Sequence, residues 1–353
     1  MLDVCVSFRD LIFDHAYRWC RERDGSVTRR WVPIGVPRLA PNIEKAVFYL
    51  YRQEPDGTFT PGGTGFLVVR HSVRLPFTLH FYAVSNRHVV QGLGLTASAC
   101  SCLRLNTKAG GVRFIEYEPT DWLCSDIEDL AIVDVTEQLG WSTETGLFSD
   151  DISAISEENF ARQPYAGANT VALGEQSIML GLFANHMRAG RNIPVARFGN
   201  IAATPSEDNL VRLSPFDRFA RPAFLNDMRS RDGFSGSPVW AWQTKYDDMN
   251  NHFGPGFFPS VAARDKSSLL LAGIHRGQFP EKIIMSLEDG TKIKGEIPSS
   301  MTVVIPAWEI INLMNDPSMT KRAAERDDDP IRKQYSDEVC RMMRAQEARL
   351  RND

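Results

Sequence analysis

The chain has 353 residues, of which 43% are hydrophobic and 24% charged. A chain of this size can bury a sizeable core, and we expect an ordinary globular protein of two domains. The net charge of -4 provides no basic field for a phosphate backbone or an anionic membrane surface, so neither nucleic acid nor membrane is expected as a partner.

The N-terminal segment has helical spacing over residues 7 to about 20, which predicts a short amphipathic helix. Asp3, Asp10 and Asp14 interrupt its apolar residues, which excludes a secretory signal, and no run of the chain is long enough to span a bilayer. Six scattered cysteines in a chain of this length fit a reduced cytoplasm, where we place the protein.

Two of the cysteines, Cys100 and Cys102, would lie on one face of a strand and could in principle ligate a metal. No CxxC or HExxH spacing supports that reading. We therefore expect buried free thiols, with no metal and no cofactor.

Short apolar runs separated by turn residues follow a proline-punctuated link and predict a mostly β chain. Between residues 46 and 135 they read AVFYLYR, GFLVVR, LHFYAVS, VRFIEYE and LAIVDV, and after a polar stretch they read TVALG, SIMLGLF, VARFGN, LVRL, SPVWAW, LLLAGIH and MTVVIP. This grouping predicts two β domains.

Helical patterns are found in the C-terminal part of the sequence. AWEIINLM predicts one helix, and a further helix is expected to begin at Asp329 and Pro330, with an apolar stripe of Ile331, Tyr335, Val339 and Met342. The predicted organisation is an N-terminal helical extension, a first β-barrel, a linker, a second β-barrel and a C-terminal helical tail, over residues 1–39, 40–140, 141–170, 171–315 and 316–353.

Ser235 lies between two glycines in RDGFSGSPVW and is a candidate nucleophile. A serine nucleophile needs a base and a carboxylate that orients the base. His88 follows an apolar strand in AVSNRHVVQG, and Asp129 directly precedes a buried run in IEDLAIVDV. Asp126 and Asp134 are the rival acids.

The order of these residues and the sequence motifs around them resemble those of the chymotrypsin-like serine peptidases, most closely of their bacterial and intracellular branches. GGTGFLVV, VSNRHVV, EDLAIV and GFSGSPV resemble the family's strand before the histidine, its histidine motif, its aspartate motif and its nucleophile turn. The resemblance covers roughly residues 40 to 315. It implies a double six-stranded antiparallel β-barrel with N- and C-terminal helical extensions, and a serine endopeptidase that cuts a protein or peptide substrate.

In that family the first barrel provides His88 and Asp129 and the second provides Ser235, while the backbone N–H groups of Gly233 and Ser235 form the oxyanion hole. Phe234 stands where many members have an aspartate that pairs with a newly cleaved N-terminus, so activation by cleavage is not expected. Ser237 replaces a usual glycine, and no cysteine flanks His88.

The strand after the nucleophile lines the specificity pocket in the family, and here it reads LAGIHRGQ. Its Gly-Ile-His resembles the glutamate-specific branch. We therefore expect a preference for glutamate above aspartate on the acyl side of the cut bond. A partly charged imidazole and a hydroxyl would bind the carboxylate, and the expected substrate-binding residues are Arg229, Ser230, His275, Arg276 and Gly277.

Other interpretations remain open. A glycine-serine turn is often only a turn, and a single histidine is often only a satisfied polar residue. The α/β-hydrolase elbow fails because Ser237 stands at its last glycine and because that fold needs an acid and then a histidine after the serine. A catalytically inactive double barrel that serves as a binding module is the competing class. The terminal helices either pack on the barrels or dock a regulatory partner or a second copy.

Overall fold

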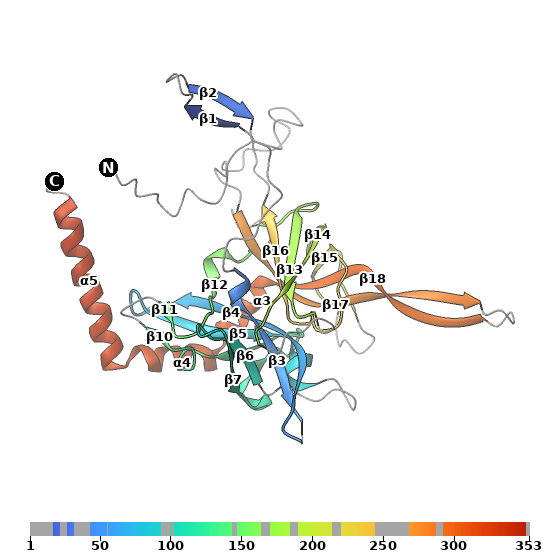
Figure 1. Cartoon of the computed structure of the whole chain (residues 1–353), viewed down its shortest axis with the longest axis horizontal. Coiled ribbons are helices and arrows are strands. Elements are labelled where there is room, and N and C mark those ends of the chain that lie inside the picture. Colours follow the sequence, from blue (N-terminus) through green and yellow to red (C-terminus); the bar gives the residue numbers. More distant parts are fainter. Residues whose placement is uncertain are drawn as a thin grey trace.

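The computed structural model describes residues 17–21, 27–31, 43–54, 56–92, 100, 102–142, 147–163, 170–183, 190–213, 220–243, 268–286 and 292–350. Within these residues the protein is mostly β, with two β-sheet domains followed by C-terminal helices (Figure 1). The fold class expected from the sequence is confirmed.

The first sheet has the strand order β7-β6-β3-β4-β5-β9-β8, and neighbours along it are antiparallel. A short strand, β12, adds parallel to β4 off this path. Most residues of the central strands are buried, which explains their nearly continuous apolar runs. The strands are β3 (Val47–Gln53), β4 (Phe59–His71), β5 (Leu79–Ser85), β6 (Cys102–Asn106), β7 (Val112–Glu116), β8 (Leu123–Cys124), β9 (Ala131–Asp134) and β12 (Ile155–Ser156).

The second sheet is a closed antiparallel barrel with the order β13-β14-β15-β18-β17-β16. Closure leaves no free edge around the barrel itself. Two of its strands, β17 and β18, are much longer than the others and extend beyond the barrel (Figure 1). The strands are β13 (Gln176–Gly181), β14 (Val195–Ala203), β15 (Phe224–Asp227), β16 (Pro238–Gln243), β17 (Ser268–Ser286) and β18 (Lys292–Pro306).

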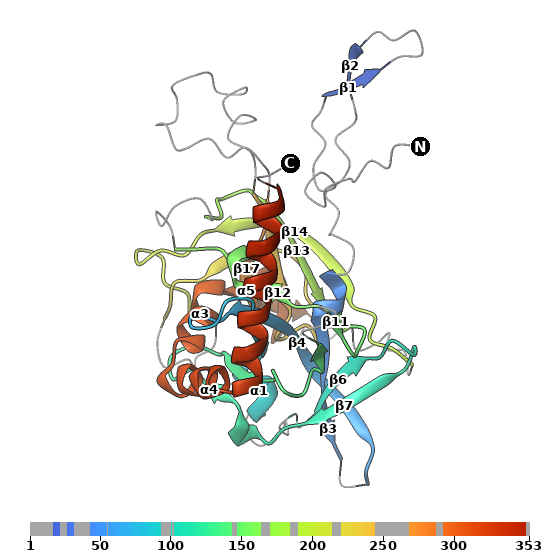
Figure 2. The same cartoon turned by 90° about the vertical axis from the view of Figure 1, so that its left-hand side faces the viewer.

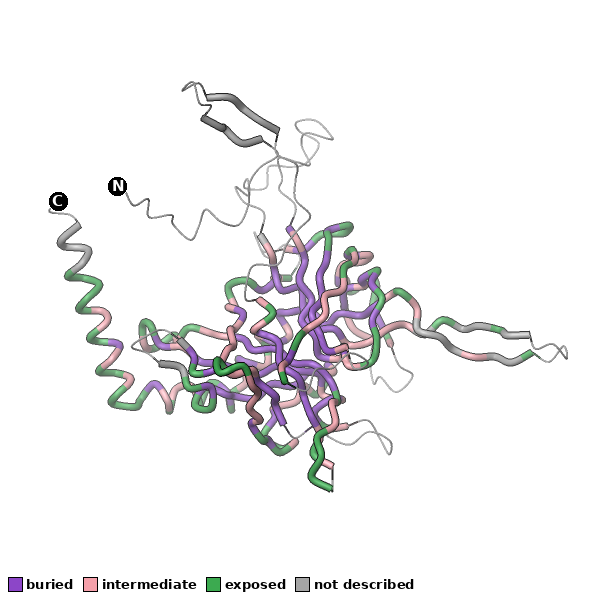
Figure 3. Tube along the Cα trace, in the orientation of Figure 1, coloured by how far each residue is buried: buried purple, intermediate pink, exposed green. Residues whose placement is uncertain are grey.

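The two domains share a hydrophobic core. One buried cluster joins Phe66 and Tyr82 of the first sheet to Leu180 and Trp240 of the barrel, together with Ile310 of the following helix. Each domain also has a core of its own, and buried residues concentrate where the two sheets meet (Figure 3). The junction between the domains is therefore packed and can hold side chains from both in fixed positions.

Three helices follow the barrel: α3 (Ala307–Met314), α4 (Pro317–Asp327) and α5 (Pro330–Leu350). The prediction of AWEIINLM and the start of a helix at Pro330 are confirmed, whereas α4 was not foreseen. Asp316 caps α4, since its side chain accepts a hydrogen bond from the N–H of Ser318 at 2.8 Å, and Pro317 occupies the first turn.

The helix α4 packs on the first sheet, and α5 then extends away from the body (Figures 1 and 2). Met319 and Asp327 of α4 are buried. Along the apolar stripe of α5, Ile331 is 77% exposed and Met342 58% exposed, while Tyr335 and Val339 are half-buried.

Some predicted elements differ from the structure. Residues 7–16 of the expected N-terminal helix lie outside the described residues, and the prediction is wrong for β1 (Tyr17–Arg21), which pairs antiparallel with β2 (Val27–Trp31). The aromatic residues of this stretch have high β propensity, and Asp-Gly at 24–25 is a typical hairpin dipeptide. TVALG contains no strand, and LVRL provides only an isolated bridge.

The remaining short elements are 3-10 turns at η1 (Ile43–Ala46), η2 (Pro119–Asp121) and η3 (Glu157–Asn159), and the two-residue strands β10 (Trp141–Ser142) and β11 (Leu147–Phe148). Cys100 and Cys102 are buried free thiols, as expected. None of the helices within the described ranges is long and apolar enough to cross a membrane.

Candidate active site

His88 is positioned by the short helix α1 (Arg87–Gln91), which begins directly after the end of β5. Val89 and Val90 are both buried and fix this helix to the core of the first domain. The neighbouring histidine is held at the edge of that core with 19% of its side chain exposed. The apolar residues that follow His88 in the sequence therefore serve as its anchor.

Asp129 contacts His88 through both oxygens of its carboxylate. Its Oδ2 lies 2.6 Å from Nδ1 of the His88 ring, and its Oδ1 accepts a hydrogen bond from the His88 backbone N–H at 2.9 Å. The side-chain amide of Asn86 donates to the Asp129 carbonyl at 2.8 Å. The carboxylate thus holds the proton on Nδ1 and leaves Nε2 as a lone pair.

The surroundings of Asp129 stabilise its ionised form. Burial alone would raise the pKa of Asp129, but the hydrogen bonds and charge of His88 and the charge of Arg276 together lower it. The rival acids lie elsewhere: Asp126 is exposed, and Asp134 pairs with Arg326 at 2.9 Å. The structure therefore brings Asp129 to His88, as predicted, and neither of its rivals.

Ser235 lies in a tight turn between Gly233 and Gly236, at φ of +94° and +85°. A Cβ on Gly236 would come within 2.0 Å of the Thr64 carbonyl oxygen and 2.5 Å of Ser85 Oγ, so the turn lies directly against the first domain. The N–H of Thr64 donates to the Ser235 carbonyl at 2.9 Å. Glycine is thus required at position 236 both by conformation and by this close approach.

Two backbone donors in this turn have no partner among the described residues. The N–H groups of Phe234 and Ser237 donate to Arg231 and Phe234 carbonyls at 3.2 and 2.9 Å, whereas no hydrogen bond from the N–H of Gly233 or Ser235 is recorded in the described part of the chain. Free N–H groups beside a serine can stabilise an oxyanion. Gly233 and Ser235 are the residues whose N–H groups the resemblance to the peptidases suggested for an oxyanion hole.

The side chain of Phe234 is fully buried, in the core of the second domain. The guanidinium of Arg197 lies 5.6 Å from its ring centroid. An aromatic residue thus fills the interior beneath the turn. Phe234 has no carboxylate that could pair with a newly cleaved N-terminus.

The structure records no hydrogen bond between the hydroxyl of Ser235 and His88. Both residues nevertheless meet at the domain junction, because the turn binds Thr64, and Gly63 lies between Val89 of α1 and the Ser235 carbonyl. A Cβ on Gly63 would lie 2.8 Å from Val89 and 3.2 Å from that carbonyl. Such pairs are often loose without a substrate and tighten when one binds.

The predicted specificity residues fall into two groups. Ser230 and His275 are both buried, and Ser230 Oγ lies 2.9 Å from His275 Nε2. Burial, and to a smaller degree the charge of His88, lower the pKa of His275 to about 3. The partial positive charge expected on this imidazole is therefore not present at neutral pH.

Arg229 is exposed and Gly277 is half-buried. Arg276 was expected to bind substrate, but it faces another group. Its Nε lies 3.7 Å from Asp129 Oδ2, so its guanidinium faces the aspartate of the His88 pair and not a pocket around His275. Arg276 directly follows His275 on β17, and successive side chains of a strand point to opposite faces. The alternation of side chains along this strand is the sequence signal for the orientation of Arg276.

Sequence reasoning also missed Glu128 and Thr64. Burial, reinforced by Glu309, raises the pKa of Glu128 to about 7, although Arg221 and Arg276 oppose the rise. The hydroxyl of Thr64 donates to the Gly233 carbonyl at 2.7 Å and accepts from the N–H of Leu182 at 2.8 Å, which ties the nucleophile turn to the first sheet. Its place in GGTGF was the only sequence signal.

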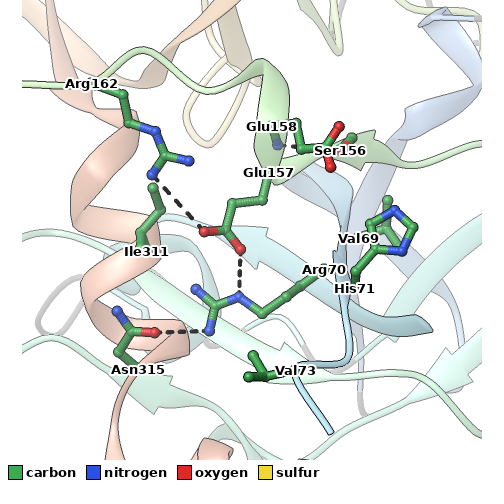
Figure 4. A pocket seen from close by; sticks show the side chains of 10 residues that line it. All are labelled: Val69, Arg70, His71, Val73, Ser156, Glu157, Glu158, Arg162, Ile311 and Asn315. Carbon is green, nitrogen blue, oxygen red and sulfur yellow. Dashed lines mark hydrogen bonds and ion pairs between the residues drawn. The ribbon is translucent and has the colours of Figure 1, made fainter. Parts of the chain in front are cut away.

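A cavity of about 360 Å³ lies away from these residues, between the end of β4, η3 and α3 (Figure 4). Its charges are paired internally: Arg70 binds Glu157 at 2.5 Å and the Asn315 side chain at 2.9 Å, and Arg162 lies 3.9 Å from Glu157. Arg70 also donates to the Met314 carbonyl and so ties the end of α3 to β4. These contacts give the cavity a structural role.

Comparison with known proteins places the chain only loosely. No protein-family model and no curated protein matches it. Among solved structures it is similar to an inactive form of the Rv3671c protease, with 13% identity, a TM-score of 0.37 and coverage of 77% of this chain and 88% of that chain. An active form of that protease from M. tuberculosis has 14% identity and a TM-score of 0.38, and the match covers 77% of this chain and 80% of that chain. A serine-to-alanine mutant in an inactive form has 14% identity and a TM-score of 0.36, and the match covers 82% of this chain and 98% of that chain. At these values the likeness is too loose to assign a function.

Proposed function

We propose that the protein is a serine endopeptidase that acts through an acyl-enzyme, with Ser235 as nucleophile, His88 as base and Asp129 as orienting carboxylate. The observation that carries the proposal is the 2.6 Å contact between His88 Nδ1 and Asp129 Oδ2, which leaves Nε2 as the basic nitrogen. The turn of Ser235 lies at the same domain junction and has two N–H donors with no partner among the described residues. This set of groups is what acyl transfer requires.

The proposed reaction conserves protons at each step. Ser235 Oγ attacks the peptide carbonyl and its proton passes to His88 Nε2, while the N–H groups of Gly233 and Ser235 stabilise the oxyanion. The imidazolium then gives this proton to the leaving amine as the C–N bond breaks. Water, deprotonated by the same nitrogen, hydrolyses the ester and restores the free serine.

The test is covalent labelling of the purified protein with a fluorophosphonate probe, combined with cleavage of a peptide library. Ser235→Ala should abolish both. Ser237→Ala is the matched control, because Ser237 is two residues away and its buried hydroxyl has no hydrogen-bond partner. A well-folded protein that neither labels nor cleaves would contradict the proposal and favour the inactive binding module.

For specificity, we propose a preference for glutamate or aspartate on the acyl side of the cut bond, with the Ser230 hydroxyl as the group that binds the substrate carboxylate. If the Nε2–H of neutral His275 donates to Ser230 Oγ, the Ser230 hydroxyl can exchange its long 3.4 Å hydrogen bond to the Arg231 carbonyl for one to a substrate carboxylate. Because His275 carries no charge, the preference for glutamate over glutamine should be modest at pH 7.

Two variants test this reading. His275→Ala and Ser230→Ala should both lower cleavage after glutamate and leave probe labelling by Ser235 in place. Cleavage mainly after lysine, arginine or large apolar residues would contradict it.

A further inference from the structure

The strand β17 connects the proposed catalytic groups to a projecting arm, defined here as residues 278–286 of β17 and 292–300 of β18 (Figure 1). At the catalytic end, the N–H of His275 donates to the Ser237 carbonyl at 2.8 Å, and the His275 carbonyl accepts from the N–H of Gly236 at 3.0 Å. The next residue, Arg276, faces Asp129. One strand thus runs from the nucleophile turn into the arm.

One edge of this strand is open. The strand β16, which follows the nucleophile turn, pairs with β17 only as far as Ile274. From Gly277 to Ser286 β17 pairs with β18 on its other side, and in the part of the chain that the structure describes no strand pairs with the edge that β16 has left. The open edge therefore begins beside Ser235 and continues along the arm.

The arm is attached at its base and exposed beyond it. Phe279 packs with Val211, Ala223 and Val303 at the side of the barrel, and the Gln278 side chain donates to the Ser299 carbonyl at 2.8 Å. The strand β15 pairs with β18 only from Met301 to Val304, so the arm lies outside the barrel. Glu281 and Lys292 are exposed, and Ile284 is 64% exposed.

An open strand edge has unpaired N–H and C=O groups and takes up an extended peptide by strand addition. We propose that the arm is an extended substrate-binding edge, on which the polypeptide on the acyl side of the cut bond adds as an antiparallel strand. This inference rests on the proposed peptidase function. At about 3.3 Å per residue, residues 278–286 would bind a stretch of roughly 30 Å.

The direction of β17 selects the acyl side. The strand runs outward from the catalytic groups, so a peptide antiparallel to it runs inward and brings its C-terminal end to Ser235. Antiparallel pairing is the more stable arrangement per residue. The residues before the cut bond therefore lie along the arm. Pro280 has no N–H, so the edge divides into an inner part up to Phe279 and an outer part from Glu281 to Ser286.

The experiment uses one well-cleaved peptide whose acyl side is lengthened from two to ten residues. It compares the full chain with an arm variant in which residues 281–297 are replaced by Asn-Gly, a two-residue hairpin turn between the paired Pro280 and Pro298. In the full chain, kcat/KM should rise as the acyl side grows beyond four residues, and in the arm variant the rise should be absent. The shortest peptide should be cleaved equally by both.

Backbone pairing has a further signature. N-methylation of successive acyl-side residues should lower kcat/KM at every second position by about threefold to tenfold, the effect of one lost hydrogen bond. At the outer positions this sensitivity should disappear in the arm variant. Ile331→Ser, the matched control, changes an exposed isoleucine on α5 outside the arm and should keep the full dependence on length.

The outcomes separate the two proposals. Absence of probe labelling and of cleavage of the shortest peptide contradicts the peptidase function, and the arm inference with it. Normal labelling and cleavage, but no dependence on acyl-side length or the same dependence in the arm variant, contradicts the arm inference alone. A dimer that only the arm variant loses, with unchanged length dependence, would assign the arm to self-association and also overturn the inference.

Discussion

A histidine and an aspartate lie together at each end of β5, yet the two pairs differ in exposure and in the position of the proton. His88 and Asp129 lie just past the end of the strand, with 19% and 12% of their side chains exposed. His80 and Asp327 lie at its start, with 2% and 4% exposed, and their Nε2 and Oδ1 atoms are 3.1 Å apart. The partners of the ring nitrogens explain the difference.

At His80 the guanidinium of Arg326 lies 3.2 Å from Nδ1 and can only donate, so Nδ1 is the acceptor and the proton is on Nε2, facing Asp327. At His88 the proton is on Nδ1 and Nε2 is free. Neither Nε2 of His80 nor Oδ1 of Asp327 makes a hydrogen bond of good geometry. A histidine–aspartate pair is therefore no sign of catalysis unless the second nitrogen is free and accessible.

The largest effect should separate the two aspartates. Asp129→Asn should lower kcat by about 10⁴, because an amide no longer holds the proton on Nδ1. Asp327→Asn, the same change at the other pair, should leave kcat within about twofold. Steady-state kinetics on one peptide would measure both, and equal losses at unchanged stability would show that the pairs are not functionally distinct.

Stability should show the reverse order. Asp327→Ala removes the acceptor of the 2.6 Å hydrogen bond from Ser72 and leaves buried polar groups unpaired, which should lower the free energy of unfolding by about 2 to 3 kcal/mol. Asp129→Ala, in the more exposed pair, should cost less, about 1 kcal/mol, because it removes the acceptor of the His88 backbone N–H in a partly solvated place. Urea unfolding followed by tryptophan fluorescence compares them, and a larger loss for Asp129→Ala would contradict the assignment.

His80 should contribute to the pH dependence of stability, in the same direction as the buried His275. Burial, and then Arg326 and Arg332, lower the pKa of His80 below its ordinary value of 6.5, although Asp327 and Asp134 act in the opposite direction. The unfolded chain then takes up this proton first, so the free energy of unfolding should fall as pH drops below about 6.5.

The slope from this one group is at most about 1.4 kcal/mol per pH unit and ends below the folded-state pKa. His80→Asn should reduce the slope of the curve between pH 7 and pH 5, and the slope that remains belongs to His275 and other groups. An unchanged slope in that variant would assign the dependence to other groups.

The smallest effect concerns Arg276, whose charge helps to lower the pKa of Asp129. Arg276→Gln should move the acidic limb of the kcat/KM profile to higher pH, by less than about one unit because the side chain is partly solvated. Arg229→Gln is the matched control, because Arg229 is exposed and should leave the limb unchanged. A profile that moves equally in both variants would reflect net charge and not this contact.

The sequence was most informative where local pattern and tertiary position coincide. His88 and Asp129 each adjoin an apolar strand, so an alternation readable from the sequence placed them at the edge of a core. The turn around Ser235 was readable because glycine at 233 and 236 reflects positive φ. The orientation of Arg276 followed from the alternation of side chains along β17, whereas the pairing of His80 with Asp327 joins residues far apart in the sequence and could not be predicted.

The long arm and α4 were missed for different reasons. An isolated two-stranded ribbon has no core on either side, so its sequence need not show the alternation that marks a half-buried strand. For α4 a start signal was present, because Asp316 followed by Pro317 is a typical helix N-terminus, but the charged sequence after it has only Met319 as a buried apolar residue. The N-terminal helix prediction failed at Tyr17–Arg21, the part of it that the structure describes, because the aromatic residues there favour a strand.

The contact of Arg326 with Asp134 also sets a time scale for synthesis. The two residues are 192 positions apart in the chain. At 5 to 20 residues per second, a ribosome needs roughly 10 to 40 seconds to travel that distance. During this interval the strands β5 and β9 of the nascent chain are already made, while the carboxylate of Asp134 and the ring of His80 have not yet met the cation that α4 brings. The helix α4, which is synthesised late, thus completes the contacts of β5 and β9, which are synthesised early.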